Sequence, residues 1–389
     1  MDVNNLAVNA IRVICAEAVE KAKSGHPGLP LGSAPIAYTL FKEHMKFNPK
    51  DPAFKDRDRF ILSAGHGSML DYALLHLFGY DLSMEDIENF RQSGSKTPGH
   101  PEYGHTPGIE TTTGPLGQGI ANAVGMAIAE TRLAAEFNRN DFPIVDHYTY
   151  ALCGDGCMME GIEYEAASLA GTLKLGKLIV LYDKNNITIE GDTDKAFTED
   201  VGQRHKAQGW HVQYVKDGND MRAVSKAIAK AKKETEKPSL IIVNTVIGYG
   251  SSKQGTAAVH GAPLGKEDIT ELRRNLGYDY PPFTVPDEVK KYLVKYVKQG
   301  VKIQKKWEEM FEQYKKAYPE LAERYAAFSE NRLPEFLKDD ALFEFAKPDA
   351  TRNTSFKVLN RLAETVPNLM GGSADLAPSN KSEMKSREY

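Results

Sequence analysis

Asp155 and Asn185 are the two residues of this chain whose types and spacing best fit a chemical site. Asp155 stands between two glycines shortly after the apolar run 148–152, and Asn185 follows the apolar run 178–182. Each run is typical of a buried strand, and the separation of 30 positions (185 − 155) fits one strand–helix–strand unit. Since the carboxyl ends of parallel strands meet at one edge of a sheet, the two side chains are predicted to lie side by side.

A carboxylate and an amide oxygen placed together suit a hard divalent cation that keeps coordination places for phosphate oxygens. The glycines beside Asp155 let the backbone approach a phosphate group and supply N–H donors. A Gly-Asp-Gly triplet alone is more typical of an ordinary turn. The second half of the pattern, after a second strand, favours a site for a diphosphate carried on a metal ion.

The rest of the chain alternates strand and helix patterns, which predicts an α/β fold with a parallel sheet flanked by helices. The predicted helices are residues 5–22, 33–45, 120–138 and 221–234, and the predicted strands are residues 58–63, 148–152, 178–182 and 240–246. Residues 91–119 and 247–265 are long glycine-rich loops, and such loops in a compact domain are usually functional.

The sequence pattern and the composition change in the C-terminal part of the chain. Residues 286–328 have a charged helical pattern, and a shift in composition then indicates a linker. A helix at 354–364 and a strand at 369–375 are predicted after it, as the beginning of another α/β unit. We therefore predict a first domain over 1–330, a linker over 331–350 and the incomplete start of a second α/β domain over 351–389.

Four of the ten histidines share one setting, a glycine-containing loop after a helix or strand. They are His26 in Ser-Gly-His-Pro-Gly, His66 in Ala-Gly-His-Gly, His100 in Pro-Gly-His-Pro and His260 in Val-His-Gly-Ala-Pro. One such histidine is usually a surface or capping residue. The recurrence of the setting favours groups that exchange protons with sugar-like hydroxyls.

The bulk composition narrows the class of protein. The 389 residues are 41% hydrophobic and 26% charged with a net charge of −4, so nucleic acid is not the expected partner. We expect no membrane association, because no apolar run is long enough to span a bilayer. The N-terminus lacks a signal-peptide pattern, and three cysteines do not make a disulfide framework, so the cytoplasm is the expected location.

These motifs together resemble the transketolase family, whose enzymes depend on thiamine diphosphate. The resemblance rests on the four histidine segments and on residues 113–119, 154–161 and 371–376, in order along the whole chain. Deoxyxylulose-phosphate synthase and dihydroxyacetone synthase are similar relatives. The segments around His100 and His260 favour transketolase over the first, and the second stays an alternative.

The resemblance implies a cofactor, thiamine diphosphate, and a divalent cation, Mg²⁺ or Ca²⁺. The implied metal ligands are the side chains of Asp155 and Asn185 and the carbonyl of Ile187. The implied cofactor-binding residues are His66, Gly114, Leu116, Gly156, Asn185 and His260.

The implied reaction, of the pentose phosphate pathway, transfers a two-carbon glycolaldehyde unit from a ketose phosphate to an aldose phosphate. The implied catalytic residues are His26, His66, His100, His260 and Glu160, and the implied substrate-binding residues are His26, His100, His260, Arg352 and Ser379. His26 and His260 would handle protons, His100 would hold the terminal hydroxyl, and Arg352 and Ser379 would contact the substrate phosphate. The implied assembly is a homodimer with the site at the interface, where Glu160 joins a carboxylate network.

The resemblance also implies that further chain completes the site, because the family's aminopyrimidine-activating glutamate lies beyond residue 389. We therefore expect a truncated fragment that is inactive by itself. Two alternatives stay open: a non-catalytic fragment that binds a metal-diphosphate, and a zinc hydrolase built on the histidines.

Overall fold

The structure is a computed structural model of the chain and describes residues 1–330, 335–338, 340–373 and 375–387. It divides into two units, Met1–Met310 and Phe311–Tyr389, which we describe separately. The domain boundary that the sequence predicts at residue 330 stays a prediction.

The first unit is built on a five-stranded sheet with the order β1-β2-β3-β7-β6, in which every neighbouring pair is parallel. The strands are β1 (Arg59–Leu62), β2 (Thr149–Gly154), β3 (Leu178–Lys184), β6 (His211–Val215) and β7 (Ser239–Asn244). Strands β2, β3 and β7 are almost wholly buried, as expected for the centre of a parallel sheet. The register pairs Gly154 with Asp183, so the two predicted strand ends do lie side by side.

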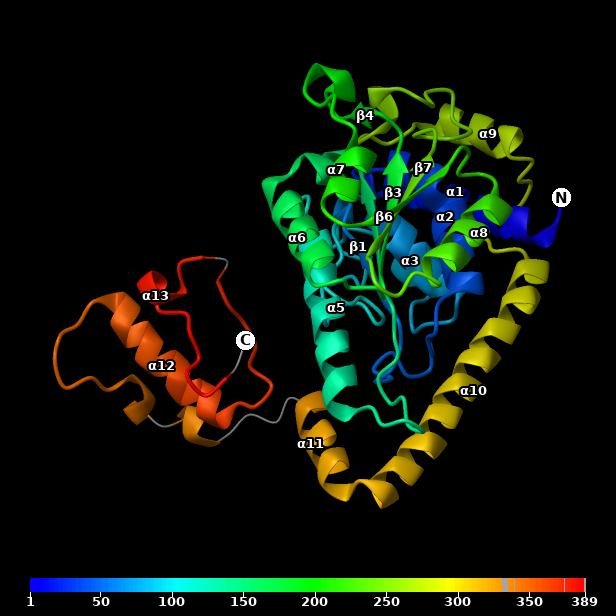
Figure 1. The fold of residues 1–389 in the computed structure, drawn as a ribbon. Helices are drawn as coiled ribbons and strands as arrows, with labels where there is room; N and C mark the ends of the chain where they lie inside the picture. Colours follow the sequence, from blue (N-terminus) through cyan, green and yellow to red (C-terminus); the bar gives the residue numbers. More distant parts are fainter. Residues whose placement is uncertain (331–334, 339, 374, 388–389) are drawn as a thin grey trace. The chain divides into compact units, whose positions relative to one another are not determined.

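Helices cover both faces of this sheet, with α5 and α6 on one side and α1, α2 and α8 on the other (Figure 1). The helices are α1 (Val3–Ala22), α2 (Gly28–Glu43), α3 (Ser68–Leu77), α4 (Met84–Glu88), α5 (Gln118–Phe137), α6 (Gly161–Thr172), α7 (Val201–Ala207), α8 (Met221–Ala231), α9 (Lys266–Asn275) and α10 (Asp287–Ala317), within which the first unit ends. Short 3-10 helices are η1 (Gly65–Gly67), η2 (Asp155–Met159), η3 (Thr193–Lys195) and η4 (Ala257–Val259), and β4 (Ile187–Thr188) pairs with β5 (Gly191–Asp192). The predicted parallel α/β fold is confirmed.

Three differences between the sequence-based assignments and the structure have a physical reason. Helix α2 begins at Gly28 rather than at residue 33, because Pro30 lies in its first turn, where no N–H is needed. Strand β6 carries an irregular burial pattern at the edge of the sheet and was not predicted. Residues 369–373 and 375 form no strand, since the described part of their unit offers no strand to pair with, and Ala374 lies outside the described residues.

The second unit contains short helical elements. They are α11 (Pro319–Ser329), η5 (Glu335–Lys338), η6 (Asp340–Phe343), α12 (Thr351–Thr365) and α13 (Ala377–Asn380). Asn360 of α12 holds the end of the chain, because its Nδ2 donates to the carbonyl of Glu383 (3.1 Å) and its Oδ1 accepts the N–H of Lys385 (2.8 Å). No helix among the described residues has the length and apolar character that crossing a membrane requires.

Glycine at position 171 is required by a close backbone approach between α6 and the turn before β6. A Cβ atom placed there would lie 1.7 Å from the carbonyl oxygen of Gln208, and backbone cannot yield as a flexible side chain can. We expect Gly171→Ala to lower the free energy of unfolding by about 1–3 kcal/mol or more, measured by urea denaturation. The control is Gly161→Ala in the same helix, where a Cβ would meet no atom within 4 Å. Equal stability of the two variants would contradict this packing.

Candidate active site

Asp155 lies at the carboxyl edge of the sheet, as the first residue of η2, directly after β2. Its Oδ1 accepts a hydrogen bond from the hydroxyl of Tyr182 (2.6 Å), and its Oδ2 accepts the N–H groups of Asn185 (3.1 Å) and Asn186 (2.9 Å). Asn186 has a φ of 61°, a left-handed conformation that asparagine tolerates and that turns the chain around the carboxylate. The turn after β3 therefore wraps the carboxylate that follows β2.

Asn185 is fixed by hydrogen bonds on both sides of its amide. Its Nδ2 donates to Oδ2 of Asp183 (3.2 Å), and its Oδ1 accepts the N–H of Ile187 (3.0 Å). Oδ1 retains a second lone pair, so it can also bind a cation. Asp155, Asn185 and Ile187 all line one cavity, so the structure brings together the three predicted metal ligands.

The surroundings of Asp155 fit a divalent cation. The side chain is 4% exposed, and this burial raises the pKa of Asp155 against the lowering effect of its hydrogen bonds. Among the described residues, no lysine or arginine forms an ion pair with this carboxylate, and Lys184 lowers its pKa only from beyond ion-pair distance. A buried carboxylate without a cation is costly, and a bound metal ion would neutralise it.

A cavity of about 390 Å³ lies beside this carboxylate. It is lined by His26, Leu29, His66, His100, Gly114, Leu116, Gly154, Asp155, Gly156, Cys157, Met159, Glu160, Asn185, Ile187, Thr188, Ile189, Ile247 and His260. A Cβ atom at Gly156 would lie 2.8 Å from Cδ1 of Leu116, so the glycine leaves room at the wall of the cavity. Gly114 and Leu116 come from the long loop before α5, so this loop reaches the candidate site.

The four glycine-loop histidines converge on this cavity. The ring centroids of His26 and His66 are 5.1 Å apart, those of His66 and His260 are 5.3 Å apart, and those of His26 and His260 are 6.1 Å apart. His100 lines the same cavity, and its Cδ2 would lie 3.4 Å from a Cβ atom at Gly114. Histidines separated by up to 234 positions (260 − 26) therefore meet in one place.

Burial keeps these imidazoles neutral. Burial first, and the neighbouring rings after it, lower the pKa of His26 to about 4 and that of His66 to about 3. The pKa values of His100 and His260 are also lowered by burial. Nδ1 of His26 and Nδ1 of His260 are buried without a hydrogen-bond partner among the described residues. The cluster thus lines the cavity with neutral rings.

This neutrality has a consequence for stability in acid. The pKa of His26 is about 4 in the folded chain and 6.5 in the unfolded chain. As pH falls, the unfolded chain therefore takes up the proton first. The contribution of His26 to the free energy of unfolding is therefore fully present above about pH 6.5 and is lost as the pH falls towards 4. We expect His26→Gln to lose less unfolding free energy than the parent over that range in urea denaturation. Parallel losses in the two proteins would contradict a neutral buried ring.

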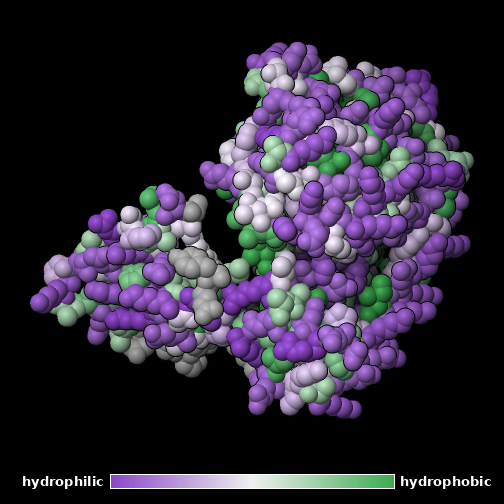
Figure 2. Space-filling model, in the orientation of Figure 1, coloured by the Kyte–Doolittle hydropathy of each residue, from purple (hydrophilic) through white to green (hydrophobic). Residues whose placement is uncertain are grey.

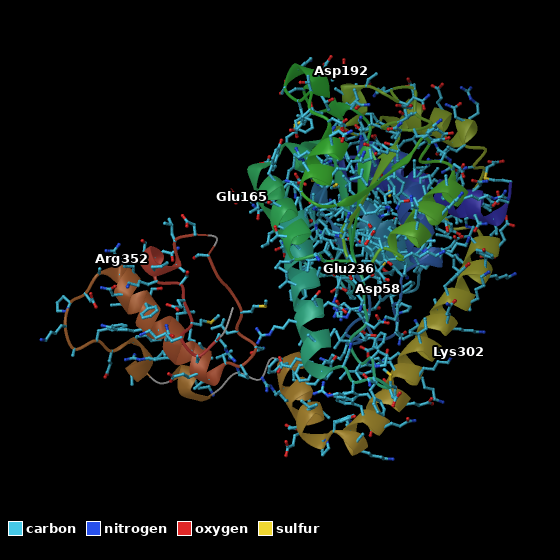
Figure 3. The ribbon with its side chains drawn as sticks, in the orientation of Figure 1. Asp58, Glu165, Asp192, Glu236, Lys302 and Arg352 are labelled. Atoms are coloured by element: carbon cyan, nitrogen blue, oxygen red, sulfur yellow. The ribbon has the colours of Figure 1, made fainter. Side chains whose placement is uncertain are left out.

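Four predicted site residues lie at the surface. His100 and Glu160 line the cavity but are exposed in the single chain. Arg352 on α12, which Figure 3 labels, and Ser379 on α13 are both exposed and belong to the second unit. Their proposed roles stay predictions.

Some lining residues carried no signal in the sequence. Met159, Ile189 and Ile247 are apolar residues in or beside loops, and such residues are common on any surface. Within the described residues, no group of three or more His, Cys, Asp and Glu side chains is arranged to hold a metal ion. The histidine cluster therefore gives the zinc-hydrolase alternative no ligand set.

Comparison with known proteins identifies the class of this domain. Residues 3–334 match the family model described as transketolase, thiamine diphosphate binding domain. The chain is 55% identical over 388 residues to the transketolase of Halalkalibacterium halodurans, covering 98% of this chain and 58% of that protein. It is 55% identical over 393 residues to the chloroplastic transketolase-1 of Arabidopsis thaliana, covering 97% and 52% respectively.

Solved structures agree with this match. Transketolase from Leishmania mexicana superimposes with a TM-score of 0.92 at 49% identity, covering 99% of this chain and 58% of that one. Transketolase from Pichia stipitis in complex with sedoheptulose-7-phosphate gives 0.93 at 49% identity, covering 99% and 57%. The domain is a thiamine-diphosphate-binding α/β domain, and the chain belongs to the transketolase family. It spans a little over half the length of these relatives.

Proposed function

We propose that the side chains of Asp155 and Asn185 and the carbonyl of Ile187 hold Mg²⁺ or Ca²⁺, which in turn binds the diphosphate of thiamine diphosphate. The buried carboxylate without a cation and the fixed amide beside it support this assignment. Gly114, Gly156, His66 and His260 would contact the cofactor, and Leu116 would pack on its rings. Their positions in the wall of one cavity support these roles.

The proposed activity is transfer of a two-carbon glycolaldehyde unit between sugar phosphates, a reaction of the pentose phosphate pathway. Bound thiamine diphosphate supplies an electron sink that allows the bond beside a ketose carbonyl to break. His26 and His260 would take and return protons at the substrate hydroxyl and carbonyl oxygen, and both have an unpaired buried Nδ1. His100 would hold the terminal hydroxyl of the two-carbon unit. Low pKa values keep these rings neutral, as acceptance of a proton requires.

The proposed donors are ketose phosphates and the proposed acceptors are aldose phosphates. Structures of the Pichia stipitis transketolase and its mutants are complexes with sedoheptulose-7-phosphate, fructose-6-phosphate and xylulose-5-phosphate. Arg352 and Ser379 would contact the substrate phosphate, and the planar guanidinium suits a phosphate group. Both side chains are exposed and free to meet a ligand.

The proposed assembly is a homodimer with the site at the subunit interface, where Glu160 would join a carboxylate network. Figure 2 shows pale and apolar surface over α5 and α6 on a mostly hydrophilic face. Leu169 of α6 and Leu173, which directly follows this helix, are 46% and 45% exposed, and a Cβ atom at Gly125 of α5 would meet no atom within 4 Å. These features support close packing of a second subunit on the two helices.

We also propose the domain division 1–330 for the diphosphate-binding domain, 331–350 for a linker and 351–389 for the beginning of a pyrimidine-binding domain. The family match to residue 334 supports the first boundary. The cytoplasm is the proposed location, supported by three buried free cysteines.

The convergence of His26, His66 and His260 on the cavity that holds Asp155 and Asn185 is the observation that carries the proposed function. The test is a fusion protein that joins residues 1–389 to the part of the Halalkalibacterium halodurans transketolase beyond the matched region. We expect the fusion protein to transfer the two-carbon unit from xylulose-5-phosphate to an aldose phosphate, and the chain alone to do so weakly or not at all. A fusion protein that binds the cofactor without transferring the unit would contradict the proposal.

A further inference from the structure

The last two fully buried residues of β3 each contact one of the two proposed metal-ligand side chains. Tyr182 is 1% exposed and Asp183 is 0% exposed. Because they are neighbours on a strand, their side chains leave opposite faces of the sheet. Tyr182 reaches Asp155, and Asp183 reaches Asn185.

The Tyr182 hydroxyl fixes the orientation of the Asp155 carboxylate. It donates to Oδ1 at 2.6 Å, while the two backbone N–H groups bind Oδ2. A second cavity of about 430 Å³ is lined by both Tyr182 and Asp155, together with Lys184 and Asn186. The hydroxyl thus holds Oδ1 at a point where the carboxylate faces two cavities. Without this donor, the carboxylate would lose one of the three hydrogen bonds that fix its orientation.

The Asp183 carboxylate fixes the orientation of the Asn185 amide. Its Oδ2 accepts the Nδ2–H of Asn185 at 3.2 Å, and its Oδ1 accepts the hydroxyl of Thr245. An ionised carboxylate only accepts hydrogen bonds, so it pairs with the amide nitrogen and never with the amide oxygen. The oxygen of Asn185 is therefore the atom that remains for a cation.

We propose that Tyr182 and Asp183 are positioning residues that hold the two side-chain metal ligands in place and thereby set the affinity for the cation. This inference rests on the proposed metal site. Outer-shell partners of metal ligands typically change metal affinity by about 10- to 100-fold when they are removed. Tyr182 and Asp183 are such outer-shell partners: each contacts a proposed metal ligand, and neither contacts the cation in the proposed arrangement.

The chain offers a matched control for the tyrosine. Tyr150 lies on the neighbouring strand β2, is 0% exposed, and has a hydroxyl without a hydrogen-bond partner among the described residues. Tyr150→Phe removes the same atom from the same sheet without touching a metal ligand. For Asp183, the pair is Asp183→Ala, which removes the acceptor, and Asp183→Asn, which retains an oxygen for the amide of Asn185.

The test is a titration of the 389-residue chain with Mn²⁺ at saturating thiamine diphosphate, in which electron paramagnetic resonance measures free Mn²⁺. We expect Tyr182→Phe and Asp183→Ala to weaken Mn²⁺ binding by about 10- to 100-fold. Tyr150→Phe and Asp183→Asn should bind within about twofold of the parent, since the outer-shell contacts persist. Thermal denaturation of each variant shows whether the fold is retained. A high concentration of Mn²⁺ should restore cofactor binding to the Tyr182→Phe variant.

Asp155→Ala separates this inference from the proposed function. If Asp155→Ala abolishes Mn²⁺ binding while folded Tyr182→Phe binds like Tyr150→Phe, the positioning role is wrong and the metal site stands. If Asp155→Ala binds Mn²⁺ like the parent, the proposed metal site is wrong and the positioning role is overturned with it.

Discussion

Asp155→Ala is expected to abolish metal-dependent binding of thiamine diphosphate. The substitution removes the buried carboxylate that would neutralise the cation, and the diphosphate then loses the positive charge that binds it. We expect a loss of affinity on the order of 100-fold or more, because a ligand contributes more than its outer-shell partners. Isothermal titration of thiamine diphosphate in the presence of Mg²⁺ measures this loss.

Asp58→Ala is the matched control. Asp58 is also buried and also accepts two backbone N–H groups, those of Lys46 (2.7 Å) and Tyr148 (2.8 Å). It directly precedes β1, so it lies where the strands begin, at the opposite end of the sheet from Asp155; Figure 3 labels it. A general effect of losing a buried carboxylate would appear in both variants. Cofactor binding by folded Asp155→Ala at the parental affinity would show that this carboxylate is not a metal ligand.

The second large effect is expected for the histidines, in the fusion protein. His26→Ala and His260→Ala should lower turnover by about 10²- to 10⁴-fold, the contribution typical of a positioned acid–base group. Their effect on cofactor affinity should be small, since they are proposed to act on substrate protons. His66→Ala should weaken both turnover and cofactor binding, because His66 is proposed to contact the diphosphate.

His211→Ala serves as the control for this series, because His211 lies on the edge strand β6 and does not line the cavity. Steady-state kinetics and cofactor titration on each variant separate turnover from binding. Equal and small effects of His26→Ala, His66→Ala and His260→Ala on turnover would show that these histidines are not catalytic residues.

The proximity of Asp155 and Asn185 could be predicted from the sequence because its signal is local. An apolar run followed by Gly-Asp-Gly, and a second run followed by Asn185, place both residues at strand ends. The parallel register of β2 and β3 then brings Gly154 opposite Asp183. Tyr182 could not be found in this way, because a tyrosine that ends an apolar run has the pattern of a core residue. Its hydroxyl acquires a partner only when the chain turns Asp155 towards it.

The sequence could predict which histidines form the cluster, but it could not predict how their rings are arranged. The shared glycine-loop setting singled out His26, His66, His100 and His260, and the structure places all four on one cavity. The stacking of His66 on His260 depends on how the loops after α1, β1 and β7 approach each other. A Cβ atom at Gly261 would lie 3.0 Å from Cδ2 of His26, so a glycine there eases the approach of the loop that carries His260 to the ring of His26.

The errors of the sequence-based assignment also have physical causes. Helix α2 begins five residues before the predicted start at 33, because Pro30 lies in its first turn, and the buried helix interior also tolerates the missing N–H of Pro35. The strand predicted at 369–375 failed in its described residues because a strand depends on a neighbour, and local sequence says nothing about whether one is present.

The most direct test of the central claim is titration of thiamine diphosphate into the 389-residue chain with Mg²⁺ and, separately, with a chelator of divalent cations. The arrangement of Asp155, Asn185 and the glycine-lined cavity predicts saturable binding with the cation and its loss in the chelator. Binding of equal affinity under the two conditions, or no binding with Mg²⁺ present, would contradict a metal-held diphosphate at this site.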